Sequence, residues 1–197
     1  MRDRFRDWNL LHKSVVAVIA AVVFSVVFRL VLVIDAGFEL TYEKVMPYSA
    51  RDIWAFIDDD KNRVRWQAEL VDTQRLTGDM VQAGSTRLLF WKRGYKTWHA
   101  VEQTKEALPE RLFATIQESD RDQRWYRIEL APEGECSTRV SVREVIRPKA
   151  YNKRFWFFSE EGVHDARWDA SFAALDRWLK RSVGDMCAGR EAGSETP

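Results

Sequence analysis

The sequence predicts an α+β domain, built from an antiparallel sheet and a long C-terminal helix, that follows one transmembrane helix. Three observations predict it: a long apolar run near the N-terminus, a series of short alternating segments broken by turn residues, and one amphipathic stripe near the C-terminus. The 197 residues suffice for an anchor and one domain with a full core, and are too few for two domains of usual size.

The anchor is predicted from residues 15–34, which read VVAVIAAVVFSVVFRLVLVI with only Ser25 and Arg29 polar. At helical rise this run matches the hydrocarbon thickness of a bilayer. We therefore expect a basic N-terminal lead over residues 1–13 and a transmembrane helix over residues 14–35.

Arg29 is near enough to the end of the run for its guanidinium to reach the headgroups, and a contact with another membrane subunit is the alternative. A cleaved signal peptide is the main rival to the anchor. Arg29 interrupts the apolar region, and Ile34-Asp35-Ala36 is a poor cleavage site, so the anchor is preferred.

Flanking charge predicts the orientation of this helix. The basic residues before it are Arg2, Arg4, Arg6 and Lys13, whereas only Lys44 and Arg51 occur soon after it. We expect a cytoplasmic N-terminus and a domain on the periplasmic or extracytoplasmic side. The tether between Ile34 and Glu39 spans about 14 Å at most, so the domain would work at the membrane surface.

The domain begins with a strand over residues 39–45 and a helix over residues 50–57, which places apolar side chains on one face. Residues 58–62 form a polar break, and residues 64–66 resemble a second helical turn. Six more strand-like runs follow, separated by turn residues: 71–76, 86–91, 97–103, 112–118, 124–130 and 138–146. The short connections imply an antiparallel meander.

The last helix is expected from Val163 to about Arg181. Its apolar residues recur at helical spacing and should cover the sheet: Trp168, Phe172, Leu175 and Leu179. Residues 183–197 are small and polar, which is typical of a disordered tail.

This order of elements resembles the SRPBCC superfamily, which includes START lipid-transfer domains, birch-pollen-allergen proteins and the polyketide cyclase/dehydrase group. The resemblance covers residues 39–182 and depends on the placement of several diffuse signals: Pro47-x-x-x-x-x-x-Trp54, Asn62-x-x-x-Trp66, the Gly78 and Gly84 hairpin, Ala107-Leu108-Pro109-Glu110-Arg111-Leu112, Ser137-Thr138-Arg139-Val140-Ser141-Val142, and Ala174-Leu175-x-x-Trp178-Leu179-Lys180. It implies a helix-grip fold, in which a seven-stranded curved sheet surrounds the C-terminal helix and encloses an apolar tunnel for a hydrophobic ligand.

Candidate ligand-binding residues are those that strand alternation or the helix stripe can point into such a tunnel. They are Phe90, Trp98, His99, Tyr126, Glu144 and Phe172. A register shift of one residue would exchange Trp98 for Thr97 or Val101. Nine Trp and eleven Phe exceed what a plain core requires, although a Trp-rich core, to which Trp54 and Trp66 are assigned, is the alternative.

No catalytic constellation is visible. Nucleophile elbows, phosphate-binding glycine loops and His-Glu-x-x-His segments do not occur. His99 could act as a general base paired with Glu144, but a lone strand histidine more often packs or faces solvent. None of the three histidines has metal-ligand spacing to a second ligand, so we expect neither a metal nor a cofactor.

Charge and cysteine content limit the classes of partner that the chain can bind. Lys and Arg number 31 against 30 Asp and Glu, so no overall field recruits nucleic acid. Cys136 and Cys187 suggest no zinc site, and a bridge between them would need an oxidising compartment.

A basic and aromatic segment precedes the last helix. Its residues combine headgroup-binding charge with interfacial anchors, which predicts membrane contact: Lys153, Arg154, Phe155, Trp156 and Phe157. The alternative places the aromatic side chains in the core.

The leading hypothesis is binding or transfer of a lipid, isoprenoid or quinone at the membrane surface. Two alternatives remain: an accessory subunit of a larger membrane complex, which contacts other subunits through its transmembrane helix, and a cyclase- or dehydrase-like enzyme acting on a polyketide or terpenoid.

Overall fold

The computed structural model describes residues 12–28, 37–150 and 161–183, and the chain divides into two compact units, Met1–Gly37 and Phe38–Pro197. In the first unit, residues 12–28 form a helix with exposed apolar side chains. Within the three described ranges, no helix combines the length and the apolar character needed to cross a bilayer. Residues 29–35 of the predicted span lie outside the described residues.

The second unit contains a seven-stranded antiparallel sheet with strand order β1-β7-β6-β5-β4-β3-β2. Its strands are β1 (Phe38–Met46), β2 (Leu70–Thr77), β3 (Thr86–Arg93), β4 (Lys96–Leu108), β5 (Leu112–Ser119), β6 (Asp122–Gly134) and β7 (Ser137–Pro148). Each strand from β2 to β6 pairs with its successor along the chain, while β1 pairs with β7. The predicted meander is confirmed.

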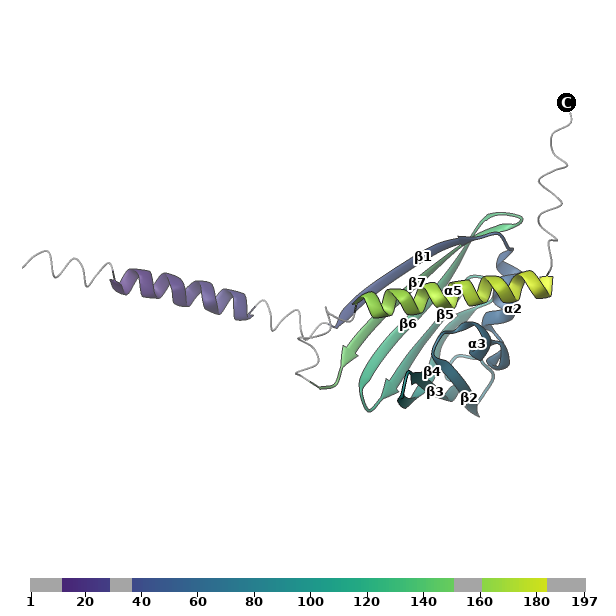
Figure 1. Cartoon of the computed structure of the whole chain (residues 1–197), viewed down its shortest axis with the longest axis horizontal. Coiled ribbons are helices and arrows are strands. Elements are labelled where there is room, and N and C mark those ends of the chain that lie inside the picture. Colours follow the sequence, from purple (N-terminus) through teal and green to yellow (C-terminus); the bar gives the residue numbers. More distant parts are fainter. Residues whose placement is uncertain (1–11, 29–36, 151–160, 184–197) are drawn as a thin grey trace, which may run out of the picture. The chain divides into compact units, whose positions relative to one another are not determined.

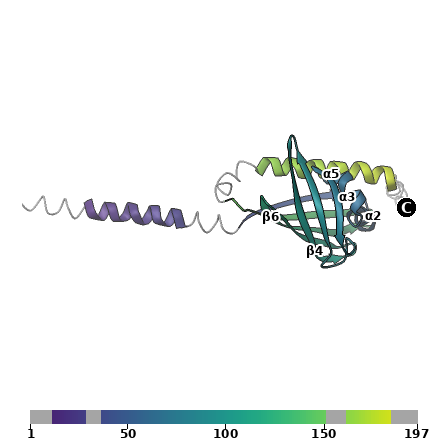
Figure 2. The ribbon, with the colours of Figure 1, turned by 90° about the horizontal axis from the view of Figure 1, so that it is seen from below.

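In the described part of this unit, three helices accompany the sheet: α2 (Ala50–Ile57), α3 (Asp60–Trp66) and α5 (Glu161–Val183). The long helix α5 runs along one face of the curved sheet, as the two views in Figure 1 and Figure 2 show. Helices α2 and α3 contact α5 near its C-terminal half (Figure 1). This arrangement of sheet and helix is the expected helix-grip architecture.

Side-chain caps set where the two short helices begin. The Ser49 hydroxyl accepts a hydrogen bond from the Asp52 N–H at 3.2 Å, and the Asp59 carboxylate accepts one from the Lys61 N–H at 2.8 Å. The expectation of a polar break over residues 58–62 was therefore wrong, because Asp59 is the N-cap of α3 and the helix starts inside that segment.

The apolar stripe of α5 is buried as predicted. Its members are at most 4% exposed: Trp168, Phe172, Leu175 and Leu179. They share one core cluster with Ile53 and Trp54 of α2 and with Trp66 of α3. Burial of this stripe against the sheet and α2 stabilises the domain by removing apolar surface from water.

Candidate functional site

The inner face of the sheet carries charge where the sequence predicted an apolar tunnel. The cross-strand register places Arg87 beside Glu102, Glu102 beside Gln117, and Gln117 beside Arg124. All four residues are buried. The candidate tunnel residues predicted from the sequence include one carboxylate, Glu144, but this row of polar side chains across β3, β4, β5 and β6 was not anticipated.

The first charged group, here named the Glu102 cluster, consists of Arg63, Arg87, Glu102, Thr115 and Gln117. The Glu102 carboxylate accepts hydrogen bonds from both terminal nitrogens of Arg63, the Nη2 contact being 2.7 Å, and from Arg87 Nη1 at 2.8 Å. The Thr115 hydroxyl and the Gln117 amide also donate to it, at 3.1 and 2.8 Å. One fully buried carboxylate thus neutralises two arginines, aided by the partly buried Asp60, which lies 3.3 Å from Arg87 Nε.

Glu102 is held in its ionised form. Burial alone would raise its pKa, but the adjacent Arg63 and Arg87 outweigh burial and lower the pKa to about 2. Such a carboxylate accepts hydrogen bonds throughout the physiological pH range. It is a poor general base, because a base of this strength holds a proton only weakly.

The second charged group, the Glu144 cluster, consists of Asp122, Arg124, Glu144, Arg167 and Trp168. Glu144 Oε2 accepts hydrogen bonds from Arg167 Nη2 and from the Trp168 indole N–H, the latter at 3.1 Å. Glu144 Oε1 lies 3.4 Å from Arg124 Nη1. Arg124 also pairs with Asp122 at 2.8 Å. Burial opposes the ionised form of Glu144, but Arg167 and Arg124 prevail and lower its pKa.

Tyr126 lies between the two clusters. On the sheet its neighbours are Thr115 of β5 and Glu144 of β7, one from each cluster. The Tyr126 side chain is 4% exposed, and its hydroxyl has no hydrogen-bond partner among the residues that the structure describes. Burial raises the pKa of this phenol, so it stays protonated and can donate.

Aromatic rings gather around Trp168 at this point. The ring centroids of Tyr42, Tyr126 and Phe172 lie 5.6, 5.4 and 5.9 Å from that of Trp168, and the Tyr126 ring stacks on it with an interplanar angle of 16°. These four residues are named the aromatic group below. The inner face thus offers flat apolar surfaces directly beside charged hydrogen-bonding groups.

The six predicted ligand-binding residues divide between the two faces of the sheet. Four lie on the inner face or on α5 against it: Trp98, Tyr126, Glu144 and Phe172. Phe90 and His99 are cross-strand neighbours on the outer face, where His99 is exposed. The expected inward orientation was wrong for these two residues, and so was the hypothesis of a His99–Glu144 pair. A role in ligand binding stays a prediction for the remaining four.

Trp98 lies apart from the aromatic group, near the start of β4. Its ring stacks on Trp91 at 6.2 Å, and the Arg121 guanidinium lies 4.6 Å from its centroid. The predicted membrane-contact residues lie outside the described residues. They are Lys153, Arg154, Phe155, Trp156 and Phe157, and their contact with the membrane stays a prediction.

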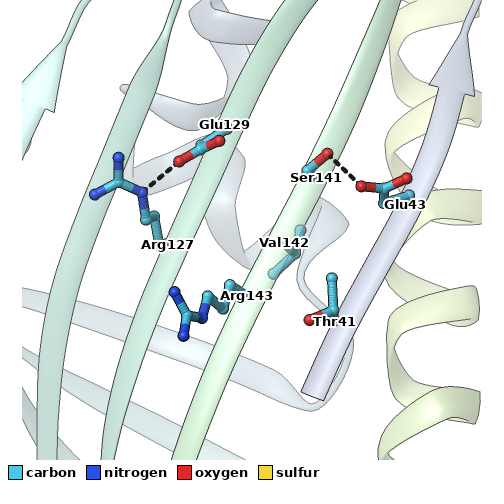
Figure 3. A pocket seen from close by; sticks show the side chains of 7 residues that line it. All are labelled: Thr41, Glu43, Arg127, Glu129, Ser141, Val142 and Arg143. Atoms are coloured by element: carbon cyan, nitrogen blue, oxygen red, sulfur yellow. Dashed lines mark hydrogen bonds and ion pairs between the residues drawn. The ribbon is translucent and has the colours of Figure 1, made fainter. Parts of the chain in front are cut away.

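The outer face has a polar depression of about 400 Å³ over β1, β6 and β7 (Figure 3). Its charged side chains already have partners: Arg127 pairs with Glu129 at 2.5 Å, and Glu43 accepts from the Ser141 hydroxyl at 3.2 Å. Arg143 pairs with Glu39 at 2.6 Å. These solvated pairs favour a water-exposed surface over a ligand site. In the described parts of the chain, no three His, Cys, Asp or Glu side chains gather as a metal site requires.

The protonation of His164 responds to the charged residues of the Glu144 cluster, so the pH dependence of stability tests how that cluster is charged. Burial and the nearby Arg167 lower its pKa from 6.5 to about 4, against the opposing effect of Glu144; Arg124 and Arg93 add to the lowering. Between these two pH values the unfolded chain binds a proton that the folded chain does not. Stability present above pH 6.5 is therefore lost as the pH falls towards 4.

We expect the free energy of unfolding to fall by about 2 kcal/mol between pH 7 and pH 5 through His164. Urea denaturation of the full chain in detergent, followed by tryptophan fluorescence, measures this change. His164→Asn should flatten the profile in that interval, and an equal slope in both proteins would contradict the assignment.

Comparisons with known proteins identify the fold through solved structures. No family model and no curated protein match the sequence. Among solved structures, a START superfamily protein from Mycobacterium smegmatis matches with TM-score 0.60 and 13% identity, over 74% of this chain and 99% of that one. The ZhuI aromatase/cyclase from Streptomyces sp. R1128 matches with TM-score 0.60 and 13% identity, over 79% and 98%. The protein TTHA0849 from Thermus thermophilus matches with TM-score 0.63 and 14% identity, over 74% and 99%. The chain therefore has an SRPBCC-like fold, and at these identities the likeness shows the fold alone.

Proposed function

We propose that this protein binds or transfers a hydrophobic small molecule, such as a lipid, isoprenoid or quinone, inside its helix-grip domain at a membrane surface. One observation carries the proposal: between the sheet and α5, the aromatic group lies against buried polar groups, among them the unpartnered Tyr126 hydroxyl. Ligand sites typically combine apolar walls with a few oriented polar groups in this way. The fold shared with a START superfamily protein supports it.

Binding is favoured over a cyclase- or dehydrase-like reaction. Such chemistry needs a group that exchanges protons near neutral pH, whereas arginines lower the pKa of both Glu102 and Glu144. The pKa of His164 is also lowered, to about 4. The aromatase/cyclase with the same fold keeps the enzymatic alternative open for test.

The membrane location depends on the N-terminal part of the chain. Apolar side chains on the helix over residues 12–28 are exposed on all sides, and the apolar sequence continues to Ile34. We infer that residues 14–35 anchor the chain with the domain outside the cytoplasm. Cys136 is disulfide-bonded, which fits an oxidising compartment. Cys187, the other cysteine of the chain, lies outside the described residues.

Purification from carbonate-washed membranes tests both parts of this proposal. The full chain should stay in the membrane pellet, because a spanning helix is held far more firmly than a peripheral contact. After mild detergent extraction and purification, solvent extraction and mass spectrometry should detect an enriched apolar molecule.

Two aromatic variants provide the matched comparison. Phe172→Trp enlarges a ring inside the aromatic group and should exclude the molecule, because the added ring would occupy the space that the molecule needs. Trp125→Phe changes a partly exposed ring on the outer face and should retain it. Release of the chain by carbonate would contradict the anchor, and equal ligand content in all three proteins would contradict the interior site.

A further inference from the structure

The Tyr126 hydroxyl is the most informative buried group that the fold leaves unused. It is enclosed between β6 and α5, has no hydrogen-bond partner within residues 12–28, 37–150 and 161–183, and lies on a ring that already stacks on Trp168. Arg167 Nε, on a side chain whose guanidinium lies 5.3 Å from the centroid of the Trp168 ring, is likewise buried and has no partner among the described residues. Buried polar groups almost always have partners, so these two atoms indicate a missing one.

Both atoms are donors, which restricts the chemistry of the missing partner. A protonated phenol can donate, and a guanidinium can only donate. The partner must therefore present a hydrogen-bond acceptor. An ammonium group, which offers donors alone, is excluded as the complement of Arg167.

The charge balance restricts the partner further. Among the described residues, four arginines are buried, and they already pair with four carboxylates: Arg63, Arg87, Arg124 and Arg167 with Asp60, Glu102, Asp122 and Glu144. A buried anionic ligand would add a charge without a counterion, which is costly in a medium of low dielectric constant. A neutral acceptor, such as a carbonyl oxygen, meets no such cost.

We propose that the Tyr126 hydroxyl donates a hydrogen bond to the carbonyl oxygen of a flat, uncharged, apolar ligand whose ring packs on the aromatic group. This inference rests on the proposed binding function and names the chemical class that the site selects. Arg167 Nε supplies a second donor in the same environment. The ligand class is an aromatic or quinone-like ketone, as opposed to a hydrocarbon or a carboxylate.

Three probes of matched shape test the proposal: 1-indanone, indane and indane-1-carboxylate. Each is titrated into the full chain, labelled with ¹⁵N-tryptophan, in detergent micelles at pH 7.5. The readout is the indole resonance of Trp168, whose N–H donates to Glu144. Partitioning of a probe into micelles is the same for every variant, so it cancels when variants are compared.

We expect Tyr126→Phe to weaken 1-indanone binding about tenfold, because it deletes a single hydrogen bond and keeps the ring, and to change indane binding less than twofold. Indane-1-carboxylate should bind the wild-type protein more weakly than 1-indanone after each affinity is corrected for the measured partitioning of that probe into the micelles. Tyr48→Phe is the control, because Tyr48 donates instead to Asp176, two helical turns further along α5. It should leave the ratio of 1-indanone to indane affinity unchanged.

The outcomes separate the two proposals. Equal effects of Tyr126→Phe on 1-indanone and indane would overturn the carbonyl site and leave the binding function standing, with a buried water as the partner of Tyr126. Tighter binding of the carboxylate than of the ketone would also overturn it. Failure of every probe to shift the Trp168 resonance would overturn both. Tyr126→Phe should melt no lower than the wild type, which shows that a lost affinity is not lost folding.

Discussion

Glu102→Gln is expected to lower the free energy of unfolding by about 3–5 kcal/mol, since it leaves the buried Arg63 and Arg87 with the partly buried Asp60 as their remaining counterion. The carboxylate is 0% exposed and accepts from both arginines. An amide of the same shape keeps the packing and also presents donors towards the arginine donors. The loss therefore reports charge rather than volume.

The matched control for this substitution is Glu129→Gln. Glu129 pairs with Arg127 at 2.5 Å, but both side chains are about half exposed. Exposed pairs contribute about 1 kcal/mol or less. Urea denaturation of both variants in detergent should separate them clearly, and an equal loss would contradict the account of the Glu102 cluster.

Trp168→Ala is expected to cost about 3–5 kcal/mol, which is typical for removal of a large buried side chain. Trp168 is 2% exposed, contacts the other three rings of the aromatic group, and donates to Glu144 through its indole N–H. Its removal leaves a cavity and takes one donor from a buried carboxylate. Both effects destabilise the folded state.

Trp125→Ala is the comparison for Trp168→Ala. Trp125 is 38% exposed and neighbours Tyr126 on the same strand, but on the opposite face of the sheet. We expect a loss of about 1 kcal/mol, close to the average for a partly exposed position. Thermal or urea unfolding measures both variants. Comparable losses would show that α5 does not depend on Trp168 for its contact with the sheet.

The fold could be predicted because its signals are local. Alternation along each strand and the α5 stripe, Trp168, Phe172, Leu175 and Leu179, need no knowledge of distant partners. The start of α3 was missed because residues 58–62 were interpreted as a polar break, although Asp59 is a good N-cap residue.

The polar centre could not be predicted in the same way. Its partners come from different strands and helices, so the pairing of Arg63 with Glu102 depends on the complete register. Alternation normally assigns charged residues to the solvent face, because unpaired charges are rarely buried. One signal was available: Arg87 shares its strand face with the apolar Leu89 and Trp91.

The inward-facing residues were predicted correctly only where the register was correct. Tyr126 and Glu144 are cross-strand neighbours on the inner face, whereas Phe90 and His99 are neighbours on the outer face. A shift of one residue exchanges the two faces, so each strand had to be placed separately.

Photolabelling of the full chain with benzophenone, an uncharged aromatic ketone, tests the central claim most directly. Under ultraviolet light its carbonyl carbon inserts into a nearby C–H bond, and peptide mass spectrometry locates the adduct. We predict adducts in β6 and α5, beside Tyr126 and Trp168, that decrease when excess 1-indanone is present. Adducts confined to residues 12–28 or to the outer face near His99, or adducts that 1-indanone does not reduce, would contradict a ligand site between the sheet and α5.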